Sequence, residues 1–235
     1  MRNSSLIGWV RTTFIAAVAV VGLSGCASNG VDYDPLEPLN RAIFGLNDGL
    51  DKAIGEPLAK GYVAVTPAPI RQNIYSFFDN LAYPNTILND FLQGKFTQGI
   101  EDTGRFLVNT IFGFGGIADV ATGMGLERHE EDFGQTLAVW GFGEGIHLEL
   151  PLFGPKSLRD VPDLAIKSAI SPLDAAGASQ AQQLAAQGGD LIDTRARLAP
   201  AIKTRNEALD PYVFQREAYR QRRRFLIYDG NPPVE

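Results

Sequence analysis

Few residues in this chain could carry out covalent chemistry. Cys26 is the one cysteine among 235 residues, and His129 and His147 are the two histidines. The sequence contains no G-x-S-x-G nucleophile turn, no H-E-x-x-H metal motif and no P-loop. We therefore expect a protein that is not an enzyme, with no metal and no cofactor. A Ser-His-Asp site assembled only by folding is the enzymatic alternative.

The cysteine stands where a covalent anchor would be attached. The apolar stretch 12–23 has 12 residues, whereas crossing a bilayer takes roughly 20, so it suits a secretory signal peptide. It ends at Leu23-Ser-Gly-Cys26, which resembles the lipobox of bacterial lipoproteins, where the new terminal thiol carries diacylglycerol. We predict a signal peptide over 1–25, a lipid-modified Cys26 and a tether over 26–33. The alternative is an ordinary signal peptide that happens to contain a cysteine.

The charges of the chain are unevenly distributed. Residues 26–194 hold 10 Lys and Arg against 22 Asp and Glu, whereas residues 195–228 hold nine against three. A nucleic-acid-binding protein would show a broader basic surface, so we expect no nucleic-acid partner. No window after the signal peptide reaches the ~18 apolar residues of a membrane-spanning helix, so any deeper contact with a membrane requires amphipathic elements or the lipid anchor.

Hydrophobic spacing predicts several amphipathic helices. Two prolines place the start of the first helix near Asn40, and prolines within 62–69 favour an extended segment there. Tyr83-Pro84 is expected to kink or stop the next helix. The clearest helix begins at Phe96 and presents two different sides. Its apolar side comprises Phe96, Ile100, Leu107 and Ile111, and its polar side Gln98, Glu101, Asp102, Arg105 and Asn109. Core packing is the usual cause of such a stripe, and a bilayer interface is the alternative.

Glycine dominates the middle of the chain. Residues 113–154 contain ten of the 25 glycines, and residues 133–154 carry two formal charges, Glu144 and Glu149. Glycine between large apolar residues gives a mobile backbone that can adopt positive φ. We predict turns and short extended pieces here, and the family resemblance given below implies a flexible hairpin over Trp140–Gly145. The alternative is a tight structural turn with a buried tryptophan.

The C-terminal helix is predicted to begin with Asp210 as N-cap and Pro211 at the first helical position. Its arginines could contact anionic lipid headgroups, and the residues proposed for this contact are Arg216, Arg220 and Arg223. The alternative is a solvated face with internal pairing, such as Glu217 with Arg220.

Several motifs in order resemble the MlaA (VacJ) lipoprotein family. They are Asp34-Pro-Leu-Glu-Pro-Leu-Asn-Arg41, Asn89-Asp-Phe-Leu-Gln-Gly94, Arg105-Phe-Leu-Val-Asn-Thr110, Gly113-Phe-Gly-Gly-Ile-Ala-Asp-Val120, Phe133-Gly-Gln-Thr-Leu137, Leu150-Pro-Leu-Phe-Gly-Pro155, Leu158-Arg-Asp160, Asp210-Pro-Tyr212 and Arg216-Glu-Ala-Tyr219. The resemblance covers residues 34–228, which we interpret as a lipid-transport domain followed by a flexible tail over 229–235.

The resemblance implies a mainly α fold: a ring-shaped bundle of amphipathic helices with a Gly-rich hairpin region, little β structure and an N-terminal lipid anchor. It implies an outer-membrane lipoprotein, on the periplasmic side, that removes mislocalised phospholipids from the outer leaflet through an amphipathic pore. The implied partners are outer-membrane porin trimers and a soluble periplasmic carrier that leads to an inner-membrane ABC transporter. Ala27 after the cysteine favours the outer membrane by resemblance to bacterial sorting rules.

The resemblance also implies pore or gate residues on two segments. They are Trp140, Gly141, Phe142, Gly143 and Gly145 in the glycine-rich segment, and Asn40, Arg41, Phe44 and Asn47 in the first helix. Asn40 could instead cap that helix. For the whole protein the alternative is a structural envelope lipoprotein that associates with porins and transports nothing.

Overall fold

A computed structural model describes residues 34–233. The predicted signal peptide, Cys26 and the tether lie outside the described residues. Leu36–Glu235 forms one compact unit, and its described part consists of helices and one two-stranded sheet. The mainly α class with little β structure is therefore confirmed.

Three helical segments open the unit: α2 (Glu37–Leu50), a π-helical turn (Asp51–Gly55) and α3 (Glu56–Val65). The first helix begins three residues earlier than predicted, because Pro38 lies in the first turn, where a missing N–H removes no helical hydrogen bond. The predicted extended segment 62–69 is also wrong, because α3 continues to Val65 and α4 begins at Ala68, which leaves only Thr66 and Pro67 between the two helices.

A pair of long helices follows: α4 (Ala68–Gln93) and α5 (Phe96–Ile111). Pro84 lies inside α4 and does not end it, because the packing of α4 along α5 outweighs the local preference of one proline. Gly94 closes α4 with φ of +78°, a left-handed conformation that favours glycine at this position.

The glycine-rich middle contains the short elements that were predicted: α6 (Val120–Gly123), α7 (Phe133–Val139), β1 (His147–Leu150), β2 (Gly154–Ser157) and a 3-10 turn (Leu158–Asp160). The strands β1 and β2 are antiparallel, with His147 opposite Ser157 and Leu150 opposite Gly154. The hairpin was expected over Trp140–Gly145 but lies after it; that segment is the loop from α7 to β1.

The C-terminal part is helical: α8 (Pro162–Ala169), α9 (Pro172–Ala175), α10 (Gln180–Arg197), α11 (Ala199–Glu207) and α12 (Pro211–Ile227). The predicted start of α12 is confirmed, because the Asp210 side chain accepts hydrogen bonds from the backbone N–H groups of Tyr212 and Val213. A Ser179–Gln182 capping box begins α10.

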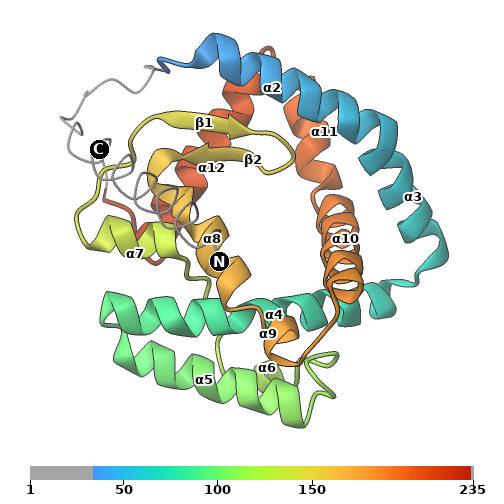
Figure 1. Cartoon of the computed structure of the whole chain (residues 1–235), viewed down its shortest axis with the longest axis vertical. Helices are drawn as coiled ribbons and strands as arrows, with labels where there is room; N and C mark the ends of the chain where they lie inside the picture. Colours follow the sequence, from blue (N-terminus) through green and yellow to red (C-terminus); the bar gives the residue numbers. More distant parts are fainter. Residues whose placement is uncertain (1–33, 234–235) are drawn as a thin grey trace, which may run out of the picture. The chain divides into compact units, whose positions relative to one another are not determined.

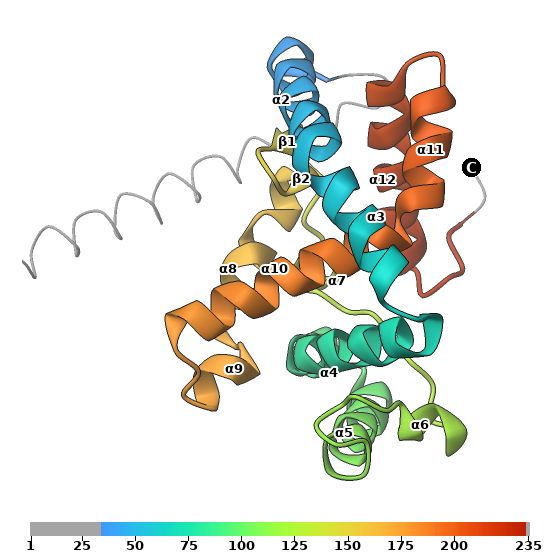
Figure 2. The same ribbon diagram turned by 90° about the vertical axis from the view of Figure 1, so that its right-hand side faces the viewer.

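Contacts between these elements form a closed circuit within the unit. α2 contacts β1, β2 contacts α12, α12 contacts α7, α7 contacts α4, α4 contacts α10, and α10 contacts α3, which continues α2. Figure 1 shows this ring of helices with the β1–β2 hairpin in its course. In Figure 2 the α4–α5 pair lies at one end and α2, α11 and α12 lie toward the other. The expected ring-shaped arrangement is present.

The interior of this unit is mainly polar. Among the described residues, the buried apolar or aromatic side chains are Ala59, Tyr83, Ala121 and Tyr212, whereas the largest fully buried side chains include Arg105, His147, Gln135 and Asn40. Buried polar groups need hydrogen-bond partners, so the packing depends on a polar network. No helix in the described range is both long and apolar enough to cross a membrane.

Candidate functional site

Helix α5 presents its apolar side outward. Phe96, Ile100 and Ile111 are 63%, 67% and 66% exposed, whereas Asp102 and Arg105 are buried. This orientation contradicts core packing of the apolar stripe. An exposed contiguous apolar face is unfavourable in water but suits contact with lipid or another apolar surface. The bilayer alternative therefore fits α5.

Large apolar side chains are exposed on other elements as well. They include Leu39, Leu46 and Ile54 near α2, Leu58 and Val65 on α3, Ile70 and Phe91 on α4, and Phe114 and Ile117 after α5. Polar atoms inside and apolar atoms outside reverse the usual order of a water-soluble domain. This exterior is suited to an apolar surrounding.

The inward side of α5 is fixed by charged hydrogen bonds. The Arg105 guanidinium donates to Asp119 at 2.6 Å and to the Leu126 carbonyl at 2.7 Å. Asn109 donates to Asp119 at 3.1 Å and accepts from the Ala121 N–H at 2.9 Å. These bonds attach the loop after α5 to the buried polar side of the helix.

A group of buried carboxyls lies between α4 and α5. Asp102 accepts from the Tyr83 hydroxyl at 3.1 Å, and His129 Nδ1 lies 3.1 Å from the same oxygen. Asp90 is fully buried and accepts from Gln98 at 2.7 Å. Burial, followed by the nearby Asp102 carboxyl, raises the pKa of Asp90 above its ordinary value.

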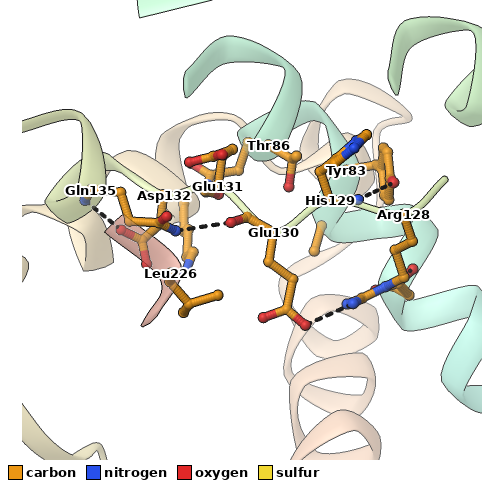
Figure 3. A pocket seen from close by; sticks show the side chains of 13 residues that line it. Tyr83, Thr86, Arg128, His129, Glu130, Glu131, Asp132, Gln135 and Leu226 are labelled. Atoms are coloured by element: carbon orange, nitrogen blue, oxygen red, sulfur yellow. Dashed lines mark hydrogen bonds and ion pairs between the residues drawn. The ribbon is translucent and has the colours of Figure 1, made fainter. Parts of the chain in front are cut away.

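Figure 3 shows the cavity beside this group, between α4, the loop before α7 and the end of α12. Its volume is 160 Å³, and Arg128, His129, Glu130 and Glu131 contribute to its lining. Pockets for drug-sized ligands usually have about 300–1,000 Å³. This cavity is therefore too small for a phospholipid and belongs to the internal polar network.

The predicted headgroup arginines of α12 point into the protein. Arg223 lies 3.0 Å from Asp160 and also pairs with Asp132, and Arg216 lies 2.8 Å from Glu217. Burial alone would raise the pKa of Asp132, but its bonds with Arg223 lower it to about 2. Arg216 and Arg223 are buried, and neighbouring carboxylates hold both guanidiniums. Headgroup contact by these two residues stays a prediction.

The third of these arginines, Arg220, is also paired internally. It lies 3.2 Å from Glu144 in the α7–β1 loop, and the predicted contact with Glu217 is present at 3.7 Å. The internal pairing of the alternative is therefore present, whereas its solvated face is not, because Arg216 and Arg223 are buried.

Side-chain contacts hold both ends of the loop Trp140–Gly145 against neighbouring elements, whereas the centre of the loop is exposed. The Trp140 indole donates to the Leu92 carbonyl at 3.0 Å, while Glu144 pairs with Arg220. Trp140 and Phe142 are about half exposed, so the alternative of a buried tryptophan is wrong. Gly141 has φ of +92°, whereas Gly143 has ordinary φ and open space where a side chain would begin. The loop can therefore accept a side chain without backbone strain at 143 but not at 141.

The predicted residues of α2 lie at the junction with β1 and α12. Arg41 pairs with Asp210 at 2.7 Å, and Phe44 packs edge-on against Tyr212 at 5.8 Å. Asn40 lies inside the helix and bonds to β1, so its alternative role as an N-cap is wrong.

These α2 residues and the glycine loop therefore have different immediate neighbours. The α2 residues contact β1 and the start of α12, whereas the loop contacts α4 and the middle of α12.

Glu149 is a buried carboxyl at this junction. It accepts hydrogen bonds from Asn47 at 3.3 Å and from Gln215 at 3.1 Å. Burial raises the pKa of Glu149 to about 7, and the two amide donors counteract only part of that increase.

Sequence reasoning missed most of the buried polar network, including Asp90, Glu131 and Gln135. A usable signal was the composition of polar stripes: Asp102, Arg105 and Asn109 on α5 are short or planar hydrogen-bonding residues, without the lysines typical of a solvated face. Such residues form directed bonds with fixed partners and are suited to a polar interior.

Taken together, an apolar exterior on a ring of helices with a polar interior defines a class of membrane-associated helical proteins. The family model described as MlaA lipoprotein matches residues 32–226. The chain belongs to the MlaA lipoprotein family.

The alignments with individual relatives cover nearly the whole chain. The intermembrane phospholipid transport system lipoprotein MlaA of Shigella flexneri is 37% identical, covering 91% of this chain and 88% of that protein. Its counterpart in Haemophilus influenzae is 28% identical, covering 94% and 92%. A solved structure described as the structural basis for maintenance of bacterial outer membrane lipid asymmetry has a TM-score of 0.74 and 34% identity, covering 83% of this chain and 99% of that chain.

Proposed function

We propose that this protein removes mislocalised phospholipids from the outer leaflet of the outer membrane and thereby maintains lipid asymmetry. The lipid crosses an amphipathic passage and is handed to a soluble periplasmic carrier that leads to an inner-membrane ABC transporter. The family membership supports transport, because the relatives are named as components of an intermembrane phospholipid transport system.

The observation that carries the proposal is the reversed polarity of the unit. Its outward apolar side chains suit acyl chains, and its buried amides and charged groups suit a polar headgroup. A headgroup in hydrocarbon without hydrogen bonds costs several kcal/mol. A protein that offers both an apolar and a polar surface lowers the free-energy barrier for moving an amphipathic lipid out of its leaflet. This is physical transfer without bond cleavage, in line with relatives named as transport lipoproteins.

The proposal includes attachment and partners. An acylated Cys26, which the Leu23-Ser-Gly-Cys26 motif supports, anchors the protein on the periplasmic side of the outer membrane. Exposed apolar side chains of α5, such as Phe96 and Ile100, provide surface for lipid or for an outer-membrane porin trimer. Porins and the soluble carrier are proposed from the family resemblance.

The rival is a structural envelope lipoprotein that binds porins without moving lipid. A complementation experiment distinguishes the transport role from the structural role. Cells that lack the gene receive either the wild-type protein or the Cys26→Ala variant. We expect wild type to lower outer-leaflet phospholipid and to copurify with phospholipid, and Cys26→Ala to remain unprocessed and to fail. Wild-type protein that restores porin association but leaves outer-leaflet phospholipid unchanged would favour the structural role.

A further inference from the structure

The connection from α5 to α6 exposes a short run of large apolar side chains. Phe112, Phe114 and Ile117 are 66%, 84% and 47% exposed, and residues 106–118 include no charged residue. In Figure 2, α5 and α6 lie at one end of the molecule, beyond α4. This run continues the outward apolar side of α5. We call residues 112–117 the aromatic tip.

The backbone of Phe114 is strained. Its φ is +55°, a left-handed conformation that is unfavourable for a residue with a Cβ atom and persists only where the surrounding structure enforces it. The phenyl ring gains little from packing inside the protein, because the residue is largely exposed. The contact that would offset this strain is therefore not made within the described residues.

The aromatic tip is fixed to the polar interior at its base. The Arg105–Asp119 ion pair, at 2.6 Å, joins the chain before the tip to the chain after it. Asn80 of α4 donates to the Thr110 hydroxyl at 3.0 Å, and a Cβ atom at Gly116 would overlap the Asn80 side chain. Only glycine permits this close approach. The tip is thus held in one conformation, with its apolar side chains directed outward.

The end of α5 also satisfies backbone groups that water usually satisfies. The last carbonyls of a helix have no partner within the helix. Here the Thr110 and Asn109 carbonyls accept from the N–H groups of Gly115 and Gly116, both at 2.9 Å. Hydrocarbon offers no hydrogen bonds, so a segment that enters it has to pair its own backbone groups. The folded end of α5 suits such a surrounding.

We propose that the aromatic tip inserts among the acyl chains of the membrane and fixes the depth of the α4–α5 pair. Acyl chains fit because the exposed side chains of the tip carry neither charges nor hydrogen-bonding groups with which a protein partner could be selected. Phe114 is the most exposed of them and is the leading contact. This inference goes beyond the proposed function, since insertion of the tip does not require that the protein moves lipid.

The test measures the depth of the tip with full-length acylated protein in vesicles of phosphatidylcholine brominated at the middle of its acyl chains. Bromine quenches tryptophan fluorescence on contact. Phe114→Trp is compared with Leu209→Trp, because Leu209 is fully exposed on the turn between α11 and α12, beside the charged Asp210. Wild-type fluorescence is subtracted to remove the contribution of Trp140.

We expect the tryptophan at position 114 to be quenched at least twice as strongly as the one at position 209. Phe112→Trp is the second variant: its backbone has ordinary φ of −94°, so it reports on the same tip without strain at the substituted residue. Equal quenching at positions 112, 114 and 209 overturns the proposal.

Phe114→Gly separates insertion from a structural role. Glycine adopts positive φ without strain, so this variant should melt at a higher temperature than wild type in detergent. Combined with Phe112→Trp, it should reduce quenching at position 112, because the leading side chain is gone. A lower melting temperature would show that Phe114 packs within the protein, and unchanged quenching would show that it does not set the depth. Either result refutes the proposal.

A photo-cross-link in cells distinguishes acyl chains from a protein partner. With p-benzoylphenylalanine in place of Phe114, the cross-linked product should be phospholipid; a product consisting mainly of a porin or another protein overturns the proposal. The complementation experiment is independent of these measurements. If wild-type protein restores lipid asymmetry but the tip is not quenched, the insertion fails and the transport function stands. A quenched tip without restored asymmetry supports insertion and refutes transport.

Discussion

Replacing Glu149 by glutamine is expected to stabilise the folded protein at neutral and alkaline pH and to change little near pH 4. Burial raises the pKa of this carboxyl from its ordinary value of 4.5 to about 7. The unfolded chain therefore releases the proton at lower pH than the folded chain does. The contribution of Glu149 to stability is therefore highest below pH 4.5 and decreases as the pH rises through 7, because the folded state then has to ionise a buried group.

The size of the effect follows from the two pKa values. The interval from 4.5 to about 7 corresponds to about 3 kcal/mol of stability lost by the wild type once the pH exceeds 8. Glutamine has no proton to lose, and its side-chain oxygen can still accept from Asn47 and Gln215. Glu149→Gln should therefore be more stable than wild type by about that amount at pH 8 and equal to it near pH 4.

The measurement is the free energy of unfolding of detergent-solubilised protein in denaturant, at several values between pH 4 and pH 8. Glu127→Gln is the matched control: it removes the same charge from an exposed position and should leave the pH dependence unchanged. A difference between Glu149→Gln and wild type that does not grow with pH would refute the reasoning, as would a loss of stability at pH 8.

Four further substitutions test other parts of the structure. Leu107→Asp, on the outward side of α5, should leave detergent-solubilised stability nearly unchanged but cost roughly 2–3 kcal/mol within a bilayer, measured as reduced membrane-bound protein; equal behaviour in both media would contradict lipid contact. Gly143→Val should fold normally, whereas Gly141→Val should lower the melting temperature, because only Gly141 needs positive φ; if the loop moves during transport, folded Gly143→Val should clear less outer-leaflet phospholipid. Arg223→Gln should destabilise by roughly 3–5 kcal/mol, since it removes the cation that pairs with Asp132 and that shares the buried Asp160 with Arg159; a normal unfolding midpoint would show that the pairing contributes little.

Local sequence was sufficient to predict several secondary-structure elements. Asp210 followed by Pro211 specified the start of α12, because both the capping carboxylate and the fixed φ of proline act within one helical turn. The spacing of apolar residues specified the helix beginning at Phe96, since helical periodicity is a property of the chain itself. Ordered family motifs specified the fold class. Prolines were less informative, because Pro38 and Pro84 are both accommodated within helices.

Tertiary structure alone decided which side of each helix is buried and which distant residues meet. The periodicity of α5 defines two faces equally well whether water or lipid surrounds the apolar one, so the inward position of Asp102 and Arg105 became visible only with their partners present. Asn40 and Asn47 bond a strand more than 100 residues away, and Arg223 meets carboxylates from two other segments. Such pairings depend on where the folded backbone brings the groups in space, and a local stretch of sequence contains no information about that distance.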